Sequence, residues 1–290
     1  MAHKKLNKTE KNMMIIFVVL SFIAIIAAVL IKIYAPKPVD PSTIPKPIPD
    51  SVKTALEEMA PSDERIQYIY DNIEQYSAEI LTYFVTRNEY KPVIDFVYDY
   101  PIKHELNKKA ILTEEELSSD LPLFMQYDER WGYKYLGGGD GGELIAQTGC
   151  LCCCLSMVYT GIEHNDQLTP DAVSVVLMGN DMLGISGTKK KAVKWFCDNY
   201  GYNCVEYSYD ENVHTDKQLV IDSLNAGKYV IVTLKPGEYT KVGHAIVIRE
   251  YKDGKFYLND PDNETRNNQP SSFEDFANDV DSLWVISDNN

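Results

Sequence analysis

Hydrophobic residues near the start of the chain form one unbroken block. Residues 13–31, MMIIFVVLSFIAIIAAVLI, include no charged side chain. A helix of these 19 residues is about 28 Å long, which is enough to cross the hydrocarbon core of a bilayer. The pattern therefore predicts a transmembrane anchor at residues 13–34, preceded by a cytoplasmic tail at residues 1–12.

Lysines indicate the orientation of this anchor, since cytoplasmic flanks are enriched in positive charge. Four lysines precede the apolar block: Lys4, Lys5, Lys8 and Lys11. A cleaved signal peptide is the alternative, but its apolar region is usually shorter and no small-x-small cleavage motif follows before Lys32. We expect a single-pass protein of the cell membrane, with its N-terminus in the cytoplasm and the rest of the chain outside.

The next two segments differ in their patterning. Residues 36–49 contain six prolines, so we expect residues 35–60 to be an extended linker. From residue 61 to 120 the apolar positions return at helical spacing. Short helices bury little surface alone, so this segment is expected to pack on the following domain or to act as a stalk. Its apolar positions include Ile66, Ile69, Tyr70, Ile73, Ile80, Leu81, Phe84 and Val85.

Residues 121–290 read as a domain in which helices come first and strands last. Helical spacing and helix-start residues predict helices near residues 150–159, 170–178, 188–200 and 215–225. Runs rich in β-branched and aromatic residues predict strands at 204–207, 229–234, 245–251, 256–258 and 283–286. This order is typical of an α+β fold with an antiparallel sheet.

Charge narrows the function classes. The chain carries a formal net charge of −15 and residues 1–36 carry +4, so the remainder carries −19. Such an acidic exterior disfavours nucleic acid as a partner and offers no basic patch for anionic lipid, although solubility alone would also explain it. The sequence has no Gly-x-x-x-x-Gly-Lys loop and only one membrane run, which argues against a nucleotidase or a transporter.

Cys150 is the first candidate for chemistry. It follows Thr148-Gly149 and opens the helix marked by Leu151 and Leu155. Unpaired N–H groups and the helix dipole at such a position favour a thiolate, the nucleophilic form of cysteine. The alternative is that Cys150 and its neighbours are small buried residues of a core helix.

A histidine and an aspartate supply a matching base. His244 opens a predicted strand, Asp253-Gly254 is typical of a hairpin turn, and the returning strand ends at Asp260. Antiparallel pairing brings the two strand ends together, so a carboxylate would lie where it can orient an imidazole. The alternative is that His244 is a hydrogen-bonded core residue.

The other cysteines indicate no metal or cofactor. Residues 152–154 share the Cys150 helix, and we expect them to be core or subsite-wall residues, because their spacing lacks the paired knuckles of a zinc site. Only Cys197 and Cys204 have a spacing that suits a disulfide.

Four short motifs together resemble the papain-like cysteine peptidases of the bacteriocin-processing (C-39-like) type. The resemblance covers about Leu121 to Ser287, and it implies a papain-like fold with the nucleophile on a helix and the base on the facing sheet. Many relatives continue with Gly-Pro-Thr after the nucleophile, whereas this chain has Leu-Cys-Cys at residues 151–153. The motifs are Gln126-Tyr-Asp128-Glu-Arg-Trp131, Gly149-Cys150, Gly243-His244 and Asp260-Pro261.

The resemblance implies a role for each matching residue. Cys150 would be the nucleophile, His244 the general base and acid, and Asp260 the residue that orients the imidazole. Gln126, with the N–H of Cys150, would stabilise the oxyanion, an interaction worth about 3 kcal/mol per donor. Gln147 is the alternative donor. Asp128 and Trp131 of the first motif are expected to be structural.

Three functions are compatible with these residues. We expect a membrane-anchored extracellular cysteine peptidase that hydrolyses peptide bonds. An amidase or acyltransferase acting on cell-wall peptide would use the same site, and a non-catalytic peptide-binding domain would keep only the fold. By analogy with other papain-like enzymes, residues 61–120 could also serve as a pro-region. The bacteriocin-exporter role of part of the family does not transfer to this chain.

Overall fold

The computed structural model describes residues 46–87, 91–104, 109–139, 142–184, 187–209 and 216–289, all within one unit of the chain, residues 45–290. The predicted tail and anchor, and the first part of the predicted linker, lie outside these ranges. Among the described helices, none combines the length and the apolar character needed to cross a bilayer.

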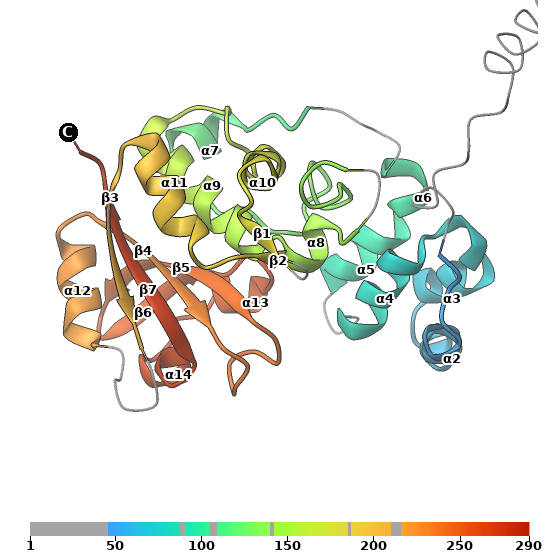
Figure 1. Cartoon of the computed structure of the whole chain (residues 1–290). Coiled ribbons are helices and arrows are strands. Elements are labelled where there is room, and N and C mark those ends of the chain that lie inside the picture. The colour runs from blue at the N-terminus through green and yellow to red at the C-terminus, as the bar shows by residue number, and fades with distance from the viewer. Residues whose placement is uncertain are drawn as a thin grey trace, which may run out of the picture. The chain divides into compact units, whose positions relative to one another are not determined.

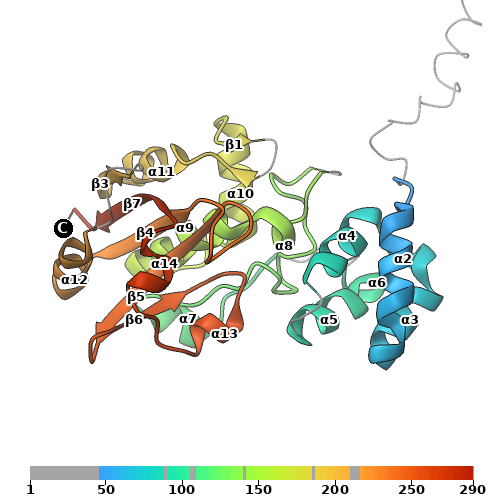
Figure 2. The ribbon, with the colours of Figure 1, turned by 90° about the horizontal axis from the view of Figure 1, so that it is seen from below.

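Five α-helices between residues 50 and 103 gather on the side of α8 that faces away from the sheet (Figures 1 and 2). We refer to residues 46–104 as the helical segment. Short 3₁₀ turns at Ala60–Ser62 and Ile73–Gln75 connect its first three helices. The helices are α2 (Asp50–Met59), α3 (Glu64–Asp71), α4 (Ala78–Arg87), α5 (Lys91–Tyr98) and α6 (Tyr100–Lys103).

Helix α2 differs from the prediction, which assigned residues 50–60 to the extended linker. Pro49 stands just before the helix, and no proline follows within it, so the backbone hydrogen bonds of a helix can form. Val52 and Leu56 lie one turn apart, and both are buried in the core of the helical segment. The proline-rich spacer therefore ends at Pro49, because an apolar stripe begins immediately after it.

The helical segment packs directly against the start of the C-terminal domain. Its core includes Tyr127, Tyr133 and Leu144 from that domain. The ring of Phe96 in α5 stacks on that of Tyr133 with centroids 4.1 Å apart, and the Tyr133 hydroxyl donates to the Phe96 carbonyl over 2.6 Å. A shared apolar core of this kind makes the helices part of one folded unit.

The C-terminal domain begins with helices and ends with strands, as expected. Its helices are α7 (Glu114–Ser118), α8 (Ile145–Thr148), α9 (Cys150–Glu163), α10 (Pro170–Gly179), α11 (Ala192–Tyr200), α12 (Lys217–Asn225), α13 (Glu264–Asn267) and α14 (Glu274–Ala277). Its strands are β1 (Leu183–Gly184), β2 (Gly187–Thr188), β3 (Asn203–Ser208), β4 (Tyr229–Leu234), β5 (His244–Lys252), β6 (Lys255–Asn259) and β7 (Val280–Ser287).

Strands β3 to β7 form one antiparallel sheet in the order β3-β7-β4-β5-β6, which confirms the predicted α+β class. Helices cover both faces of the sheet, so β4 and β5 are apolar on both sides. Ile231, Val247 and Trp284 belong to the same core as residues of α9, α10 and α11. The alternate residues Val230 and Ile246 face α12 and α14. Packing of α9 on β5 brings the start of the helix to the start of the strand.

Candidate active site

Helix α9 begins at Cys150, directly after the short helix α8 and Gly149. A side chain at residue 149 would place its Cβ 2.5 Å from the carbonyl oxygen of Ile145, so this tight junction requires glycine. The Gln147 side chain accepts a hydrogen bond from the Leu144 N–H over 2.7 Å and fixes α8. The two helices together hold Cys150 at a defined helix start.

Cys150 is the partly exposed member of the four cysteines of α9, and the other three are fully buried. Burial raises the pKa of Cys152 to about 12 and raises the pKa values of Cys153 and Cys154 well above their ordinary range. These three thiols are therefore neutral core residues, as one of the sequence interpretations proposed.

His244 and Asp260 meet at the paired ends of β5 and β6. The Nε2 atom of His244 lies 2.7 Å from Oδ1 of Asp260, and the thiol of Cys150 is near enough to raise the pKa of His244. Since Nε2 faces the carboxylate, Nδ1 is the ring nitrogen left for the thiol. Burial acts to lower the pKa of His244, but the charge and hydrogen bond of Asp260, together with the neighbouring Cys150 thiol, raise it well above its usual value.

The Asp260 carboxylate is fully buried and accepts four hydrogen bonds. Besides His244, its Oδ1 accepts the backbone N–H of Asp262 over 2.9 Å. Its Oδ2 accepts the hydroxyl of Tyr239 and a guanidinium N–H of Arg266, each over 3.1 Å. Burial acts to raise the pKa of Asp260, but His244 and these other donors lower it to about 2. The carboxylate is therefore charged at neutral pH.

Gln126 lies beside this group and is buried. Its amide nitrogen donates to the Ala146 carbonyl over 2.6 Å and to Oδ1 of Asp262 over 2.9 Å, while its backbone N–H donates to the Pro261 carbonyl. Both amide N–H groups thus have acceptors. Its Oε1 has no hydrogen-bond partner within the described part of the chain. To bind an oxyanion, Gln126 would have to exchange one of these acceptors.

The alternative donor and the other residues of the first motif have structural contacts. Gln147 caps α8 and donates its amide to the carbonyl of Glu79 over 2.9 Å. Asp128 pairs with Arg130, and the buried Trp131 donates its ring N–H to a backbone carbonyl. These contacts agree with the structural roles expected for Asp128 and Trp131.

Four residues of this region were not found from the sequence: Arg87, Tyr239, Asp262 and Arg266. Their partners are distant in the chain or lie on irregular loops, so no spacing marks them. Arg266 lies 3.8 Å over the Tyr239 ring, and Arg87 forms an ion pair with Asp262. The one available signal was the Asp260-Pro-Asp262 sequence, which places a second carboxylate two residues from the first.

Cys197 and Cys204 are adjacent in space, as their spacing suggested. Both are free thiols. The interaction with Cys204, together with burial, raises the pKa of Cys197; the same interaction lowers the pKa of Cys204, whereas burial acts to raise it.

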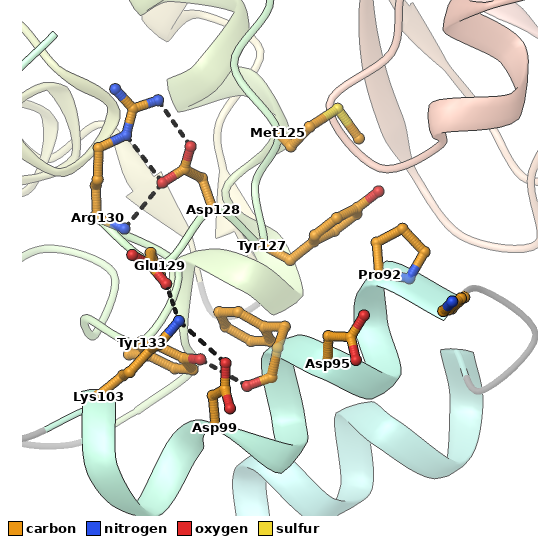
Figure 3. A pocket seen from close by; sticks show the side chains of 12 residues that line it. Pro92, Asp95, Asp99, Lys103, Met125, Tyr127, Asp128, Glu129, Arg130 and Tyr133 are labelled. Carbon is orange, nitrogen blue, oxygen red and sulfur yellow. Dashed lines mark hydrogen bonds and ion pairs between the residues drawn. The ribbon is translucent and has the colours of Figure 1, made fainter. Parts of the chain in front are cut away.

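A pocket of about 620 Å³ lies between α5, α6 and the loop around residue 127, apart from Cys150 and His244 (Figure 3). Most of its charged groups pair with one another, and Asp95 pairs with Arg65. Lys103 pairs with Asp99 over 3.0 Å and with Glu129, and Arg130 pairs with Asp128 over 2.7 Å. The residues that line this pocket include neither Cys150 nor His244.

Comparison with known families identifies the domain that contains Cys150 and His244. Residues 119–287 match the Peptidase_C39 like family, and the match covers more than half of the chain. The chain therefore belongs to this family of peptidases, and the resemblance seen in its sequence motifs is confirmed.

Among solved structures, the chain is similar to the peptidase domain of Streptococcus ComA, a bi-functional ABC transporter involved in a quorum-sensing pathway. The two share 15% sequence identity with a TM-score of 0.38, and the alignment covers 49% of this chain and 92% of that domain. No curated protein matched this chain.

Proposed function

We propose that this protein is a membrane-anchored extracellular cysteine peptidase that hydrolyses peptide bonds through Cys150, His244 and Asp260. The observation that carries the proposal is the position of His244, which is hydrogen-bonded to Asp260 through Nε2 and is close enough to Cys150 for that thiol to raise the histidine's pKa. Membership of a peptidase family supplies the reaction class.

In the proposed mechanism, Nδ1 of His244 accepts the thiol proton as the sulfur of Cys150 bonds to the substrate carbonyl carbon. The carbonyl oxygen becomes an oxyanion, which the N–H of Cys150 and the amide of Gln126 stabilise. The C–N bond then breaks, and the imidazolium protonates the leaving amine. Water hydrolyses the resulting thioester, with His244 again accepting a proton, and Asp260 keeps the ring oriented throughout.

The reaction is tested by incubating the purified full chain in detergent with a peptide library and identifying the products by mass spectrometry. We expect new peptide termini with the wild type, and none with Cys150→Ala or His244→Ala. Cleavage that persists in Cys150→Ala would refute the proposed nucleophile. If the wild type forms products only from cell-wall peptide, the amidase or acyltransferase alternative is established. If the wild type turns over no substrate at all, the binding-domain alternative is favoured.

The proposed location rests on the apolar block at residues 13–31 and the lysines before it. Protease treatment of intact cells should remove residues 121–290 while a cytoplasmic control protein survives. Protection of this domain under conditions that digest a known surface protein would overturn the orientation. A mature N-terminus near residue 35 would overturn the anchor.

A further inference from the structure

One face of helix α4 is directed at the residues around the candidate site. Residues 79, 83 and 87 stand four apart and so share this face. The carbonyl of Glu79 accepts the amide of Gln147 in α8, over 2.9 Å. Tyr83 is buried, and Arg87 forms an ion pair with Asp262. Helix α4 thus reaches both the segment before Cys150 and the segment after Asp260.

Asp262 connects Arg87 to Gln126. Its side chain is buried, with one oxygen paired to Arg87 and the other accepting the amide of Gln126 over 2.9 Å. Its backbone N–H donates to the Asp260 carboxylate over 2.9 Å. An unbroken chain of contacts therefore runs from Arg87 through Asp262 to the predicted oxyanion donor.

The carboxylate of Asp262 depends on Arg87 for its charge. Burial raises its pKa to about 6, and the negative charge of Asp260 adds to this rise, whereas Arg87 and His244 oppose it. Without Arg87, the carboxyl group would bind a proton near neutral pH. One of its oxygens would then be a hydrogen-bond donor, and the Gln126 amide would lose the acceptor that fixes its orientation.

Resting on the proposed function, we infer that Arg87 is a positioning residue of the peptidase: it holds Asp262, and Asp262 holds one N–H of Gln126, so that the other N–H stays fixed in direction and can exchange the Ala146 carbonyl for the oxyanion. The helical segment, which lies outside the region matched by the family, then supplies part of the working site. It is not a pro-region that must be removed for activity.

The test uses steady-state kinetics of the full chain on a peptide that the wild type cleaves. Arg87→Gln should lower kcat at least 10-fold, with KM changed by less than about threefold, because the oxyanion forms only in the transition state. Arg87→Lys keeps the positive charge and should recover part of the lost rate. The matched control is Arg65→Gln, which removes an arginine that pairs with Asp63 and Asp95 within the helical segment, and it should leave kcat within twofold.

A double-mutant cycle separates positioning from a merely structural role. If Arg87 acts through the Gln126 amide, then Arg87→Gln introduced into the Gln126→Ala variant should lower kcat by less than a further twofold. Thermal unfolding of each variant shows whether it is folded at the assay temperature. A variant unfolded there is replaced by Arg87→Met, which retains an unbranched, packable side chain.

The outcomes are distinct. A folded Arg87 variant with wild-type kcat, or one whose loss is equally large in the Gln126→Ala background, overturns the inference and leaves the peptidase intact. A wild-type chain that cleaves no peptide overturns the proposed function and the inference with it. A kcat loss that disappears in the Gln126→Ala background supports both.

Discussion

Replacing Asp260 by asparagine should be far more damaging than the small change in shape suggests. Both carboxylate oxygens accept from donors: His244 and a backbone N–H on one side, Tyr239 and Arg266 on the other. An asparagine has one acceptor oxygen, so its NH₂ group must face one of these sides. The hydroxyl of Tyr239 can rotate to accept, but Arg266 would then lose its bond to this oxygen.

The other orientation disturbs the reaction itself. If the NH₂ group faced His244, Nε2 would have to accept and the ring proton would move to Nδ1. The imidazole could then no longer take the thiol proton of Cys150, as when a triad histidine is held in the wrong tautomer. Asp260→Asn is therefore expected to lose activity in this orientation; in the first orientation it loses the bond to Arg266 and the negative charge that stabilises the imidazolium, so activity should fall there as well.

The expected cost in stability follows from the burial of the site. Breaking a buried ion pair by removing one partner costs about 3–5 kcal/mol, a large part of the stability of a typical domain. The pKa of Asp260 is lower in the folded protein than in the unfolded chain, so the charged carboxylate contributes roughly 2 kcal/mol of this stability. This contribution is present above pH 4 and is lost as the pH falls from about 4 to 2.

Denaturant unfolding at pH 7 measures this cost, with Asp281→Asn as the matched control. Asp281 pairs with Lys190 over 2.7 Å at a site where both side chains are at least one-third exposed, so its loss should cost less than about 1 kcal/mol. If Asp260→Asn unfolds within 1 kcal/mol of the Asp281 variant, the hydrogen bonds around Asp260 are not as described.

Three further predictions concern neighbouring residues. Brief iodoacetamide treatment at neutral pH should label Cys150 faster than the other three thiols of α9, and mass mapping that finds any of those three equally fast would place the reactive helix start elsewhere. Tyr239→Phe removes one donor to the charged Asp260 and should cost about 1.5–3 kcal/mol of unfolding free energy, so an unchanged denaturation midpoint would show that this bond contributes nothing. Gly149→Ala should lower both the melting temperature and activity, because the new Cβ would lie 2.5 Å from the Ile145 carbonyl oxygen. The control is Gly179→Ala, whose Cβ would meet no atom within 4 Å and which should be tolerated. Equal melting temperatures for the two variants would contradict the close approach at Gly149.

The sequence was sufficient for the parts of the site that local patterns determine. The hairpin around Asp253-Gly254 pairs β5 with β6, and this pairing brings the end of β6 beside the start of β5, where Asp260 reaches His244. The register shift between Ile248 and Glu250 was not predicted. The start of α9 at Cys150 was likewise predictable from the glycine before it and the apolar spacing after it. In both cases the residues that determine the local structure are close in sequence or are paired across a single β-hairpin.

The remaining contacts depend on packing between distant segments. Nothing near Arg87 indicates that it pairs with Asp262, because the pair exists only when α4 packs beside the loop after β6. Tyr239 lies in the connection before β5, where no periodicity applies, and its hydroxyl reaches Asp260 through the path of that loop. Helix α2 was missed because the prolines before it dominated the composition of the segment.

The most direct test of the account is to trap the acyl-enzyme. The full chain is mixed with a peptide that it cleaves, quenched in acid within the time of one turnover, digested and mapped by mass spectrometry. We predict that the acyl half of the substrate is attached to the peptide that contains Cys150, and that this adduct is absent in Cys150→Ala and in His244→Ala. Turnover without an adduct on Cys150, or an adduct on another residue that persists in Cys150→Ala, would contradict the assignment.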